Sequence, residues 1–297
     1  MILNINNLSK YYDRNKVLDD LNIKIKQGEI YGLLGANGAG KTTTINIICG
    51  LLNHCSGTIL IDGEKVNQKT KYKLGIATQE NLLYTQLTCE ENLRFFGQLY
   101  GLKGTKLTSS VYRCLDEVKL TGYNDTIVEN LSGGMQRRLN MAIALIHTPK
   151  LLILDEPTTG LDIEIRYEIW QLILRLKQEG MTILLTTHLL DEAEKLCDRI
   201  GILKAGRIIQ EGNLAQLKTL IPAQELVFIE TDNEEKAILQ GEKLDLSYRY
   251  YQKELAFLMP QERDLTDIIR SFAGLNLISI RKEKINLQHI YLEAIRS

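Results

Sequence analysis

The feature that most constrains the fold of this chain is a glycine-rich segment, "GANGAGKT", at residues 35–42. It matches the pattern G-x-x-x-x-G-K-[S/T], in which backbone amide groups close around phosphate oxygens. The apolar segment "EIYGLLG" leads into it and is typical of a strand, and "KTTTINIICGLL" is typical of a helix. A phosphate-binding loop requires this strand–loop–helix setting, which a chance glycine turn would lack. The chain is therefore predicted to contain an α/β nucleotide-binding fold.

The residue types in this loop suit a bound nucleotide. Glycine is needed because a Cβ would obstruct the close approach of backbone amides to the phosphates. Lys41 is expected to reach the β- and γ-phosphates, and the Thr42 hydroxyl is expected to bind Mg²⁺. The residues that we assign to the nucleotide at this loop are Gly35, Asn37, Gly38, Gly40, Lys41, Thr42 and Thr43.

Two further apolar runs predict a parallel sheet. "LLILD" at residues 151–155 and "TILLTT" at residues 182–187 are almost continuously apolar, as in parallel strands that are covered on both faces. The segment between them, residues 163–179, is typical of a helix that ends at Gly180. Together these three segments form a β-α-β unit.

Two adjacent carboxylates end the first of these strands. Asp155 is placed to hold Mg²⁺ directly or through water, and Glu156 could accept the proton of an attacking water molecule. Because adjacent residues of a strand point to opposite sides, we expect these side chains to lie apart and not to form a coupled pair. An ordinary acidic junction between a strand and a turn would have the same sequence, so the assignment depends on the phosphate loop.

Three more polar side chains lie near the predicted ends of strands. His188 follows "TILLTT", and open α/β sheets bind ligands at the carboxyl ends of their strands, so His188 could contact a γ-phosphate. Gln79 follows "LGIAT" and could order water or Mg²⁺. Tyr12, in "SKYYDR", could stack on an adenine ring. Position alone does not distinguish any of them from an ordinary surface or core residue.

A second segment of small residues, "LSGGMQRRL", spans residues 131–139. A helix that begins near Ser132 would present free backbone amides and the positive end of its dipole, which suits a phosphate. The chain already has a phosphate loop nearly a hundred residues earlier. Taken alone, the segment is equally consistent with a capped start of a helix.

The motifs together resemble those of ATP-binding-cassette ATPases. "LSGGMQ" is the signature of that superfamily, and the phosphate loop, Gln79, "LSGGMQ", "LILDEP", "TGLD" and "TTH" occur here in its order. The resemblance covers residues 1–220. It implies that Tyr12 stacks on adenine, that Gln79 couples the site to a transport partner, that Glu156 is the catalytic base and that His188 is the γ-phosphate switch.

The resemblance also implies why one chain has two phosphate-binding segments. In this superfamily two cassettes face head to tail, and the signature of each caps the γ-phosphate on the phosphate loop of the other. The residues so assigned to ATP are Ser132, Gly133, Gly134 and Gln136, and Asp162 in "TTGLD" would cross the dimer interface. The partner is expected to be a second copy of this chain or a paralogous cassette.

A closer similarity concerns the segments at residues 78–102 and 187–212. They are similar to the ATPase subunits of two-component bacterial exporters of drugs and antibiotics, of the ABC-2 type. This implies MgATP hydrolysis coupled to a separate transmembrane permease that docks near residues 79–100, and a cytoplasmic, peripheral location on the inner face of the membrane. Apolar side chains there, such as Tyr84 and Leu87, could instead belong to a core. No apolar run reaches the ~18 residues of a membrane helix, so another chain would span the membrane.

We therefore expect a P-loop NTPase cassette over residues 1–220 and an accessory α+β domain over residues 221–297. The cassette would hold an antiparallel β subdomain near its start and a helical subdomain at about residues 88–147, opened by a capping box at Thr88. The accessory domain shows the β-α-β-β-α-β order of a ferredoxin-like module, followed by one more helix.

Composition excludes some classes of protein and leaves others open. A formal net charge of −1 gives no argument for a nucleic-acid partner. Five cysteines without a C-x-x-C pair indicate reduced thiols of a cytosolic protein, not a disulfide framework or a zinc site. Two alternatives stay open: a soluble cassette ATPase without a transport role, such as the iron–sulphur assembly type, and a nucleotide-gated regulator whose accessory domain binds a small ligand.

Overall fold

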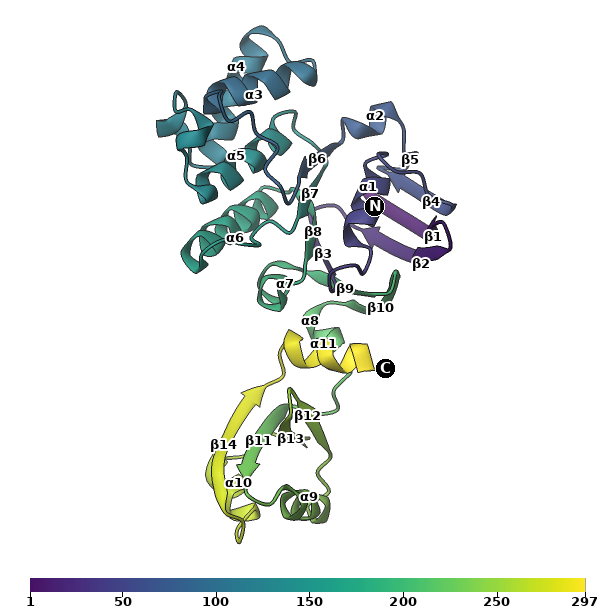
Figure 1. Cartoon of the computed structure of the whole chain (residues 1–297), viewed down its shortest axis with the longest axis vertical. Helices are drawn as coiled ribbons and strands as arrows, with labels where there is room; N and C mark the ends of the chain where they lie inside the picture. The colour runs from purple at the N-terminus through teal and green to yellow at the C-terminus, as the bar shows by residue number, and fades with distance from the viewer. Residues whose placement is uncertain (297) are drawn as a thin grey trace. The chain divides into compact units, whose positions relative to one another are not determined.

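The structure of the chain is a computed structural model that describes residues 1–296 (Figure 1). It divides into two compact units, Met1–Asn213 and a second unit that begins at Leu214. The sequence-based division at residue 220 falls one short helix later, because α8 (Leu214–Lys218) groups with the second unit, where it contacts α11 (Leu287–Arg296). Among the described residues, no helix is both long enough and apolar enough to cross a membrane.

A mainly parallel sheet of six strands forms the centre of the first unit. Its strands, in spatial order, are β10 (Arg207–Gly212), β9 (Arg199–Lys204), β3 (Ile30–Leu34), β8 (Thr182–Thr187), β7 (Leu151–Asp155) and β6 (Leu74–Ala77). Only β10 pairs antiparallel with its neighbour. Every residue of β3, β7 and β8 is buried, which confirms the prediction from their continuously apolar sequences.

The central strands contribute to two separate cores, one on each face. In β7, Leu151 and Ile153 pack in a core with α1 (Lys41–Ile48) and the N-terminal sheet. Leu152 and Leu154 pack in the other core, with α6 (Ile163–Gln178) and the helical subdomain. A third helix, α7 (Leu190–Leu196), contacts β3 and β8. The alternation of side chains along each strand therefore requires apolar residues at every position.

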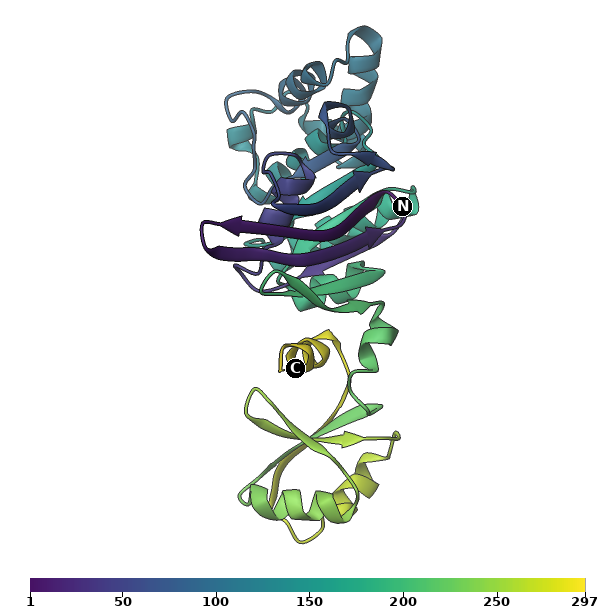
Figure 2. The same cartoon turned by 90° about the vertical axis from the view of Figure 1, so that its right-hand side faces the viewer.

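The N-terminal sheet is antiparallel, as the sequence predicts. Its order is β2 (Asn15–Ile25), β1 (Leu3–Tyr12), β4 (Ser56–Ile61) and β5 (Glu64–Lys65). Figure 2 shows the long β1–β2 hairpin, which carries Tyr12 at its tip. The inward-facing side chains of this sheet are fully buried, and they close the core that contains α1.

The helical subdomain begins after β6 and consists of three helices and two short 3₁₀ turns. These are α3 (Cys89–Leu99), α4 (Gly104–Glu117), η1 (Thr121–Tyr123), η2 (Val128–Asn130) and α5 (Gly133–Leu145). The predicted capping box is present, since the Glu91 amide donates to Thr88 Oγ1 at 3.1 Å and the Thr88 amide donates to Glu91 Oε2 at 2.8 Å. All three helices bury apolar side chains in the core they share with α6.

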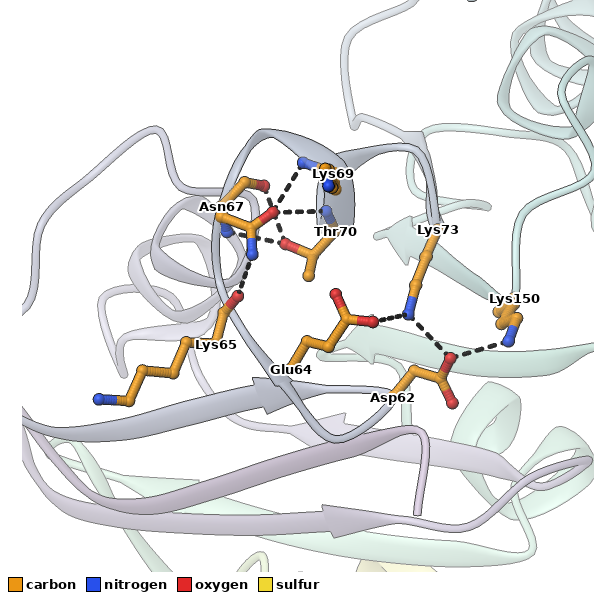
Figure 3. Close-up of polar contacts among 8 residues, drawn as sticks. All are labelled: Asp62, Glu64, Lys65, Asn67, Lys69, Thr70, Lys73 and Lys150. Carbon is orange, nitrogen blue, oxygen red and sulfur yellow. Dashed lines mark hydrogen bonds and ion pairs between the residues drawn. The ribbon is translucent and has the colours of Figure 1, made fainter.

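An ion-pair cluster joins the N-terminal sheet to the central sheet (Figure 3). Asp62, in the turn between β4 and β5, accepts hydrogen bonds from Lys73 at 2.9 Å and from Lys150 at 2.8 Å. The lysines directly precede β6 and β7, and the Lys73 carbonyl accepts from the Lys150 amide at 2.8 Å. Short helix α2 (Gln68–Lys71) follows β5 with an Asn67 capping box. The cluster therefore aligns the starts of two strands whose far ends carry predicted site residues.

The second unit is an antiparallel sheet covered by helices on both faces. Its elements after α8 are β11 (Glu225–Thr231), α9 (Glu234–Lys243), β12 (Tyr248–Tyr251), β13 (Glu254–Met259), α10 (Leu265–Ser271), β14 (Leu277–Lys284) and α11. The strand order β12-β13-β11-β14 is that of a split β-α-β module. Helices α9 and α10 share a core with one face, and His289 of α11 lies against Phe228 and Tyr251 on the other.

One predicted strand of this unit is shorter than expected. The sequence predicts a strand over residues 244–250, but β12 begins only at Tyr248. Leu244 caps α9, and Asp245 adopts a left-handed backbone with φ 55° that an extended strand cannot contain. The apolar alternation of this segment therefore reflects the end of a helix and a tight turn, not a continuous strand.

Candidate functional site

The parallel order of the central sheet brings the predicted site residues to one edge. Strands β3, β8, β7 and β6 are consecutive neighbours that run in the same direction, so their carboxyl ends lie together. The loops at these ends carry Gly35, His188, Glu156 and Gln79 respectively. Open α/β sheets bind ligands at this edge. The structure therefore unites residues that the sequence places far apart.

The loop at residues 35–42 is shaped by close backbone packing. A Cβ on Gly35 would lie 2.7 Å from the Leu203 carbonyl oxygen, so no larger residue fits there. Gly40 has φ 111° and forms the N-cap of α1 without a side-chain cap bond. The first amides of α1 therefore have no side-chain acceptor from the cap residue and are suited to an anion. The Lys41 ammonium bends back over the loop, donating to the Gly35 carbonyl at 2.7 Å.

Glu156 lies between the side chains of Lys41 and His188 at this edge. Its Oε1 is 3.2 Å from Lys41 Nζ, and its Oε2 is 3.0 Å from His188 Nδ1. The Thr159 hydroxyl also donates to Oε2, at 3.2 Å. Burial raises the pKa of Glu156, but the contacts with Lys41 and His188 outweigh burial and leave that pKa below its usual value. The side chain is therefore an ionised carboxylate near neutral pH.

Asp155 occupies a different environment from its neighbour. Its carboxylate is buried and accepts a hydrogen bond from the Thr186 hydroxyl at 2.5 Å. Burial raises the pKa of Asp155 above its usual value, and the bond from Thr186 opposes that shift. Our expectation of opposite orientations rested on strand alternation, which does not apply, because Glu156 leaves the strand with φ 48°. The two carboxylates nevertheless have separate hydrogen-bond partners.

The signature segment forms the start of α5. Ser132 is its exposed N-cap residue, and its Oγ accepts from the Met135 amide at 3.3 Å. A Cβ on Gly134 would lie 2.6 Å from the Ile165 side chain, whereas nothing lies within 4 Å of the Cβ position of Gly133. Gln136 donates to the carbonyls of Val128, in η2, at 3.1 Å and of Leu131 at 3.3 Å. Its assignment to ATP stays a prediction.

The remaining predicted ligands are open to solvent. Tyr12 is 47% exposed, with Lys10 Nζ 5.2 Å from the centroid of its ring. Asp162 is the N-cap residue of α6 but makes no side-chain cap bond. The other exposed or partly exposed side chains of this set are those of Asn37, Thr42, Thr43 and Gln79. All of these groups are free to meet a ligand or a second subunit.

Three polar residues of this region escaped the sequence analysis. Thr186 holds Asp155, and Glu192 is a buried carboxylate that accepts from the Thr158 hydroxyl at 2.7 Å and from Trp170 Nε1 at 3.1 Å. Arg137 is a buried arginine of α5 that donates to backbone carbonyls. No local pattern marks these residues, because Thr186 lies in a strand and the sequence neighbours of Arg137 and Glu192 include polar and charged residues.

Comparison with known proteins points to one family. The family model described as ABC transporter matches residues 18–159. The linearmycin resistance ATP-binding protein LnrL of Bacillus subtilis (strain 168) is 34% identical to this chain over an alignment of 310 positions. The alignment covers 98% of this chain and 97% of that protein. The chain belongs to the ABC transporter family.

Other members of the family give the same result for this ABC ATPase. The Nod factor export ATP-binding protein I of Cupriavidus metallidurans (strain CH34) is 42% identical over 219 residues, 73% of this chain and 72% of that protein. A solved dimeric ATP-binding cassette in a post-hydrolysis state, bound to ADP and Pi, matches with a TM-score of 0.64 and 29% identity over 71% of this chain and 98% of that one. The chain is thus a P-loop NTPase cassette that binds and hydrolyses ATP as a subunit of an ABC transporter.

Proposed function

We propose that this ABC ATPase drives a two-component exporter through a separate transmembrane permease. The observation that carries this proposal is the full-length similarity to a resistance ATP-binding protein, which extends over the second unit as well as the cassette. The name of the second relative also describes export. The ATPase would be peripheral on the cytoplasmic face of the membrane, held there by the permease.

Glu156 is the proposed base for hydrolysis. It would accept the proton of the attacking water, and its lowered pKa keeps it ionised for that step. The phosphates of ATP would compete with Glu156 for Lys41, since Lys41 lies within reach of both the carboxylate and the loop carbonyls. His188, on the other side of the carboxylate, would contact the γ-phosphate.

Thr42, Gln79 and Asp155 are the proposed protein ligands of Mg²⁺. The oxygen donors of these side chains suit this cation. Residues 1–296 contain no group of three or more His, Cys, Asp or Glu side chains that could hold a metal ion. A site with few protein ligands fits P-loop chemistry, in which the phosphates complete the coordination. When bound, the ion would offset negative charge on the phosphates.

Two cassettes are proposed to pair head to tail around two ATP molecules. Helices α1 and α5, which follow the phosphate loop and the signature, pack in different cores of the same unit. Ser132 is exposed, and the carboxylate of Asp162 makes no hydrogen bond to the start of its own helix, so both side chains are available to a second subunit. The amide-rich start of α5 would then meet the γ-phosphate on the partner's loop. The partner is a second copy of this chain or a paralogous cassette.

An apolar groove of about 410 Å³ is the proposed docking site for the permease. It is lined by Cys49, Leu51, Gln68, Lys71, Tyr72, Leu74, Ile76, Phe96, Leu99 and Tyr100. Leu51, Tyr72 and Leu99 are 72%, 56% and 63% exposed and line the same groove, and contiguous exposed apolar side chains mark an interaction site. A short apolar segment on the cytoplasmic side of the permease would fill the groove.

Tyr84 and Leu87, the apolar residues predicted to meet the permease, have mixed environments. Tyr84 is 49% exposed, but its ring packs edge-on against Phe95 at 4.7 Å between centroids. Leu87 is partly buried. Tyr84 would therefore lie at the edge of the docking surface, and the groove would form the centre of that surface.

Co-purification with a co-expressed transmembrane permease tests the proposal. The wild-type chain should be retained on membranes that contain the permease, and Tyr72→Glu should lose retention because a carboxylate cannot be buried in the groove. Tyr112→Glu is the matched control, because Tyr112 is 49% exposed on α4 and does not line the groove. A wild-type chain that stays in the soluble fraction would favour a soluble cassette, such as the iron–sulphur assembly type.

A further inference from the structure

A single buried arginine connects the two loops that flank the hydrolysis site. Arg137, in the second turn of α5, is 4% exposed. Its guanidinium donates to the backbone oxygens of Thr78 at 2.5 Å, Gln79 at 2.9 Å, Asp155 at 3.2 Å, Glu156 at 2.8 Å and Pro157 at 2.6 Å, and to Asn81 Oδ1 at 3.3 Å. The acceptors lie in the loop after β6 and in the turn after β7. One side chain therefore holds both segments.

Three of the acceptors are consecutive carbonyl groups, those of Asp155 at the end of β7 and of the next two residues in the turn. The middle one belongs to Glu156, whose φ of 48° lies in the left-handed region. A non-glycine residue keeps such a backbone only where its surroundings over-determine it. Here the Glu156 amide is fixed by the Thr186 carbonyl at 3.0 Å, and the Glu156 carbonyl is fixed by Arg137. The direction of the Glu156 side chain therefore depends on the guanidinium.

Arginine is the residue type that this position requires. A guanidinium presents five N–H donors in a planar fork, whereas an ammonium presents three donors from one point. All six bonds that the Arg137 side chain makes to residues 1–296 end on carbonyl oxygens, not on carboxylates. Its role is therefore to bridge neutral backbone segments and not to form an ion pair.

We propose that Arg137 is a positioning residue for ATP hydrolysis. It sets the direction of the Glu156 carboxylate and ties the turn after β7 to the loop that carries Gln79. This inference rests on the base role proposed for Glu156. Arg137 contacts neither ATP nor water in this account, and it acts through the backbone of the residues that do.

The substitution Arg137→Lys tests the inference. Lysine keeps the positive charge and much of the length, but its ammonium can bond to only one of the two segments. We expect kcat to fall by about tenfold or more and the KM for ATP to stay within about threefold, because the phosphate loop is untouched.

The matched control is Arg113→Lys. Arg113 lies on α4, and its Nη2 donates to the Leu145 carbonyl at 3.1 Å, within the helical subdomain. This variant should keep the wild-type kcat and the wild-type KM for ATP. Glu156→Gln is measured in parallel, because wild-type turnover in that variant would remove the base role of Glu156 regardless of what Arg137→Lys does.

Three results would overturn the inference: wild-type kcat in Arg137→Lys, an equal loss of kcat in Arg113→Lys, or a loss in Arg137→Lys that lies entirely in the binding of ATP. Circular dichroism and thermal melting check that each variant is folded. If Arg137→Lys is unfolded, the exposed residue Asn81 decides the question. Asn81→Ala removes one acceptor of the guanidinium and should lower kcat by about two- to threefold with KM unchanged. An unchanged kcat in that variant would then overturn the inference.

Discussion

At the scale of single residues, the site is an arrangement of charges around one carboxylate. Glu156 has Lys41 on one side at 3.2 Å and His188 on the other at 3.0 Å, and its backbone carbonyl accepts a hydrogen bond from Arg137. Asp155, one residue earlier, is buried with a hydroxyl donor and has a raised pKa. Adjacent carboxylates can therefore serve different roles, one as a base and one toward a metal ion.

Glu156→Gln is expected to bind ATP with near wild-type affinity and to lose about a hundredfold or more in turnover. The amide has the same shape but cannot accept the proton of the attacking water. Size-exclusion chromatography in ATP should show a doubled mass, because the closed dimer would persist. Glu64→Gln changes an exposed carboxylate outside the site and should behave as wild type. Wild-type hydrolysis by Glu156→Gln would exclude the base role.

At the scale of elements, an ion-pair cluster aligns the starts of β6 and β7, which lie at the opposite ends of these strands from the site. Asp62 connects the lysines that precede these strands, as Figure 3 shows. The hydrogen bonds from Lys150 and Lys73 lower the pKa of Asp62 from its usual 3.8 to about 2. A lowered pKa in the folded state means that the carboxylate stabilises the fold above pH 3.8, and that this contribution is lost as the pH falls toward 2.

Asp62→Asn should therefore lower the melting temperature at pH 7 and have a smaller effect near pH 2. The side chain keeps its shape, but it loses the charge that pairs with the two lysines. Asp267→Asn is the control, because Asp267 pairs with Arg270 at 3.5 Å on the exposed surface of α10. A melting difference for Asp62→Asn that stays constant from pH 7 to pH 2 would contradict the linkage.

Elements with a clear local pattern of apolar residues could be predicted from the sequence. Features that depend on contacts between residues far apart in the chain could not. The runs at residues 151–155 and 182–187 define strands that match β7 and β8, because a strand buried on both faces must be apolar throughout. The left-handed backbone of Glu156 could not be read from an alternating pattern. The role of Arg137 could not be found either, since its acceptors lie some 20 to 60 residues away in the chain.

At the scale of the whole molecule, the chain contains two units with separate cores. The second unit has its own apolar core, which includes Val227, Phe257 and Phe272, and none of the nucleotide motifs. The motifs all lie before Asn213. Nucleotide binding and the role of the second unit should therefore be separable.

Truncation after Asn213 should leave a folded cassette that binds ATP within a few-fold of the intact chain. Loss of the second unit is expected to show in the stability of the dimer or in transport, not in nucleotide affinity. Fluorescent-nucleotide titration and thermal melting measure the first expectation. An insoluble or unfolded product would show that the first unit depends on the second.

The shared site between two subunits is the central claim, and mixing two damaged subunits tests it most directly. Lys41→Ala removes the phosphate lysine, and Ser132→Arg places bulk where the partner's γ-phosphate would lie. Both are made in a Glu156→Gln background, in which trapped labelled ATP is measured in place of hydrolysis. Cooperativity between the two sites in hydrolysis therefore cannot hide an intact site. In a head-to-tail mixed dimer, both lesions fall in one site and the other site is intact.

Neither variant should trap ATP alone, and the mixture should trap at most one labelled ATP per dimer. Native mass spectrometry establishes separately that mixed dimers form. Occluded nucleotide is expected only on mixing, in proportion to the mixed dimers. Mixed dimers that trap no ATP would contradict the shared site, because the signature at residues 131–139 would then serve its own chain or the structure alone.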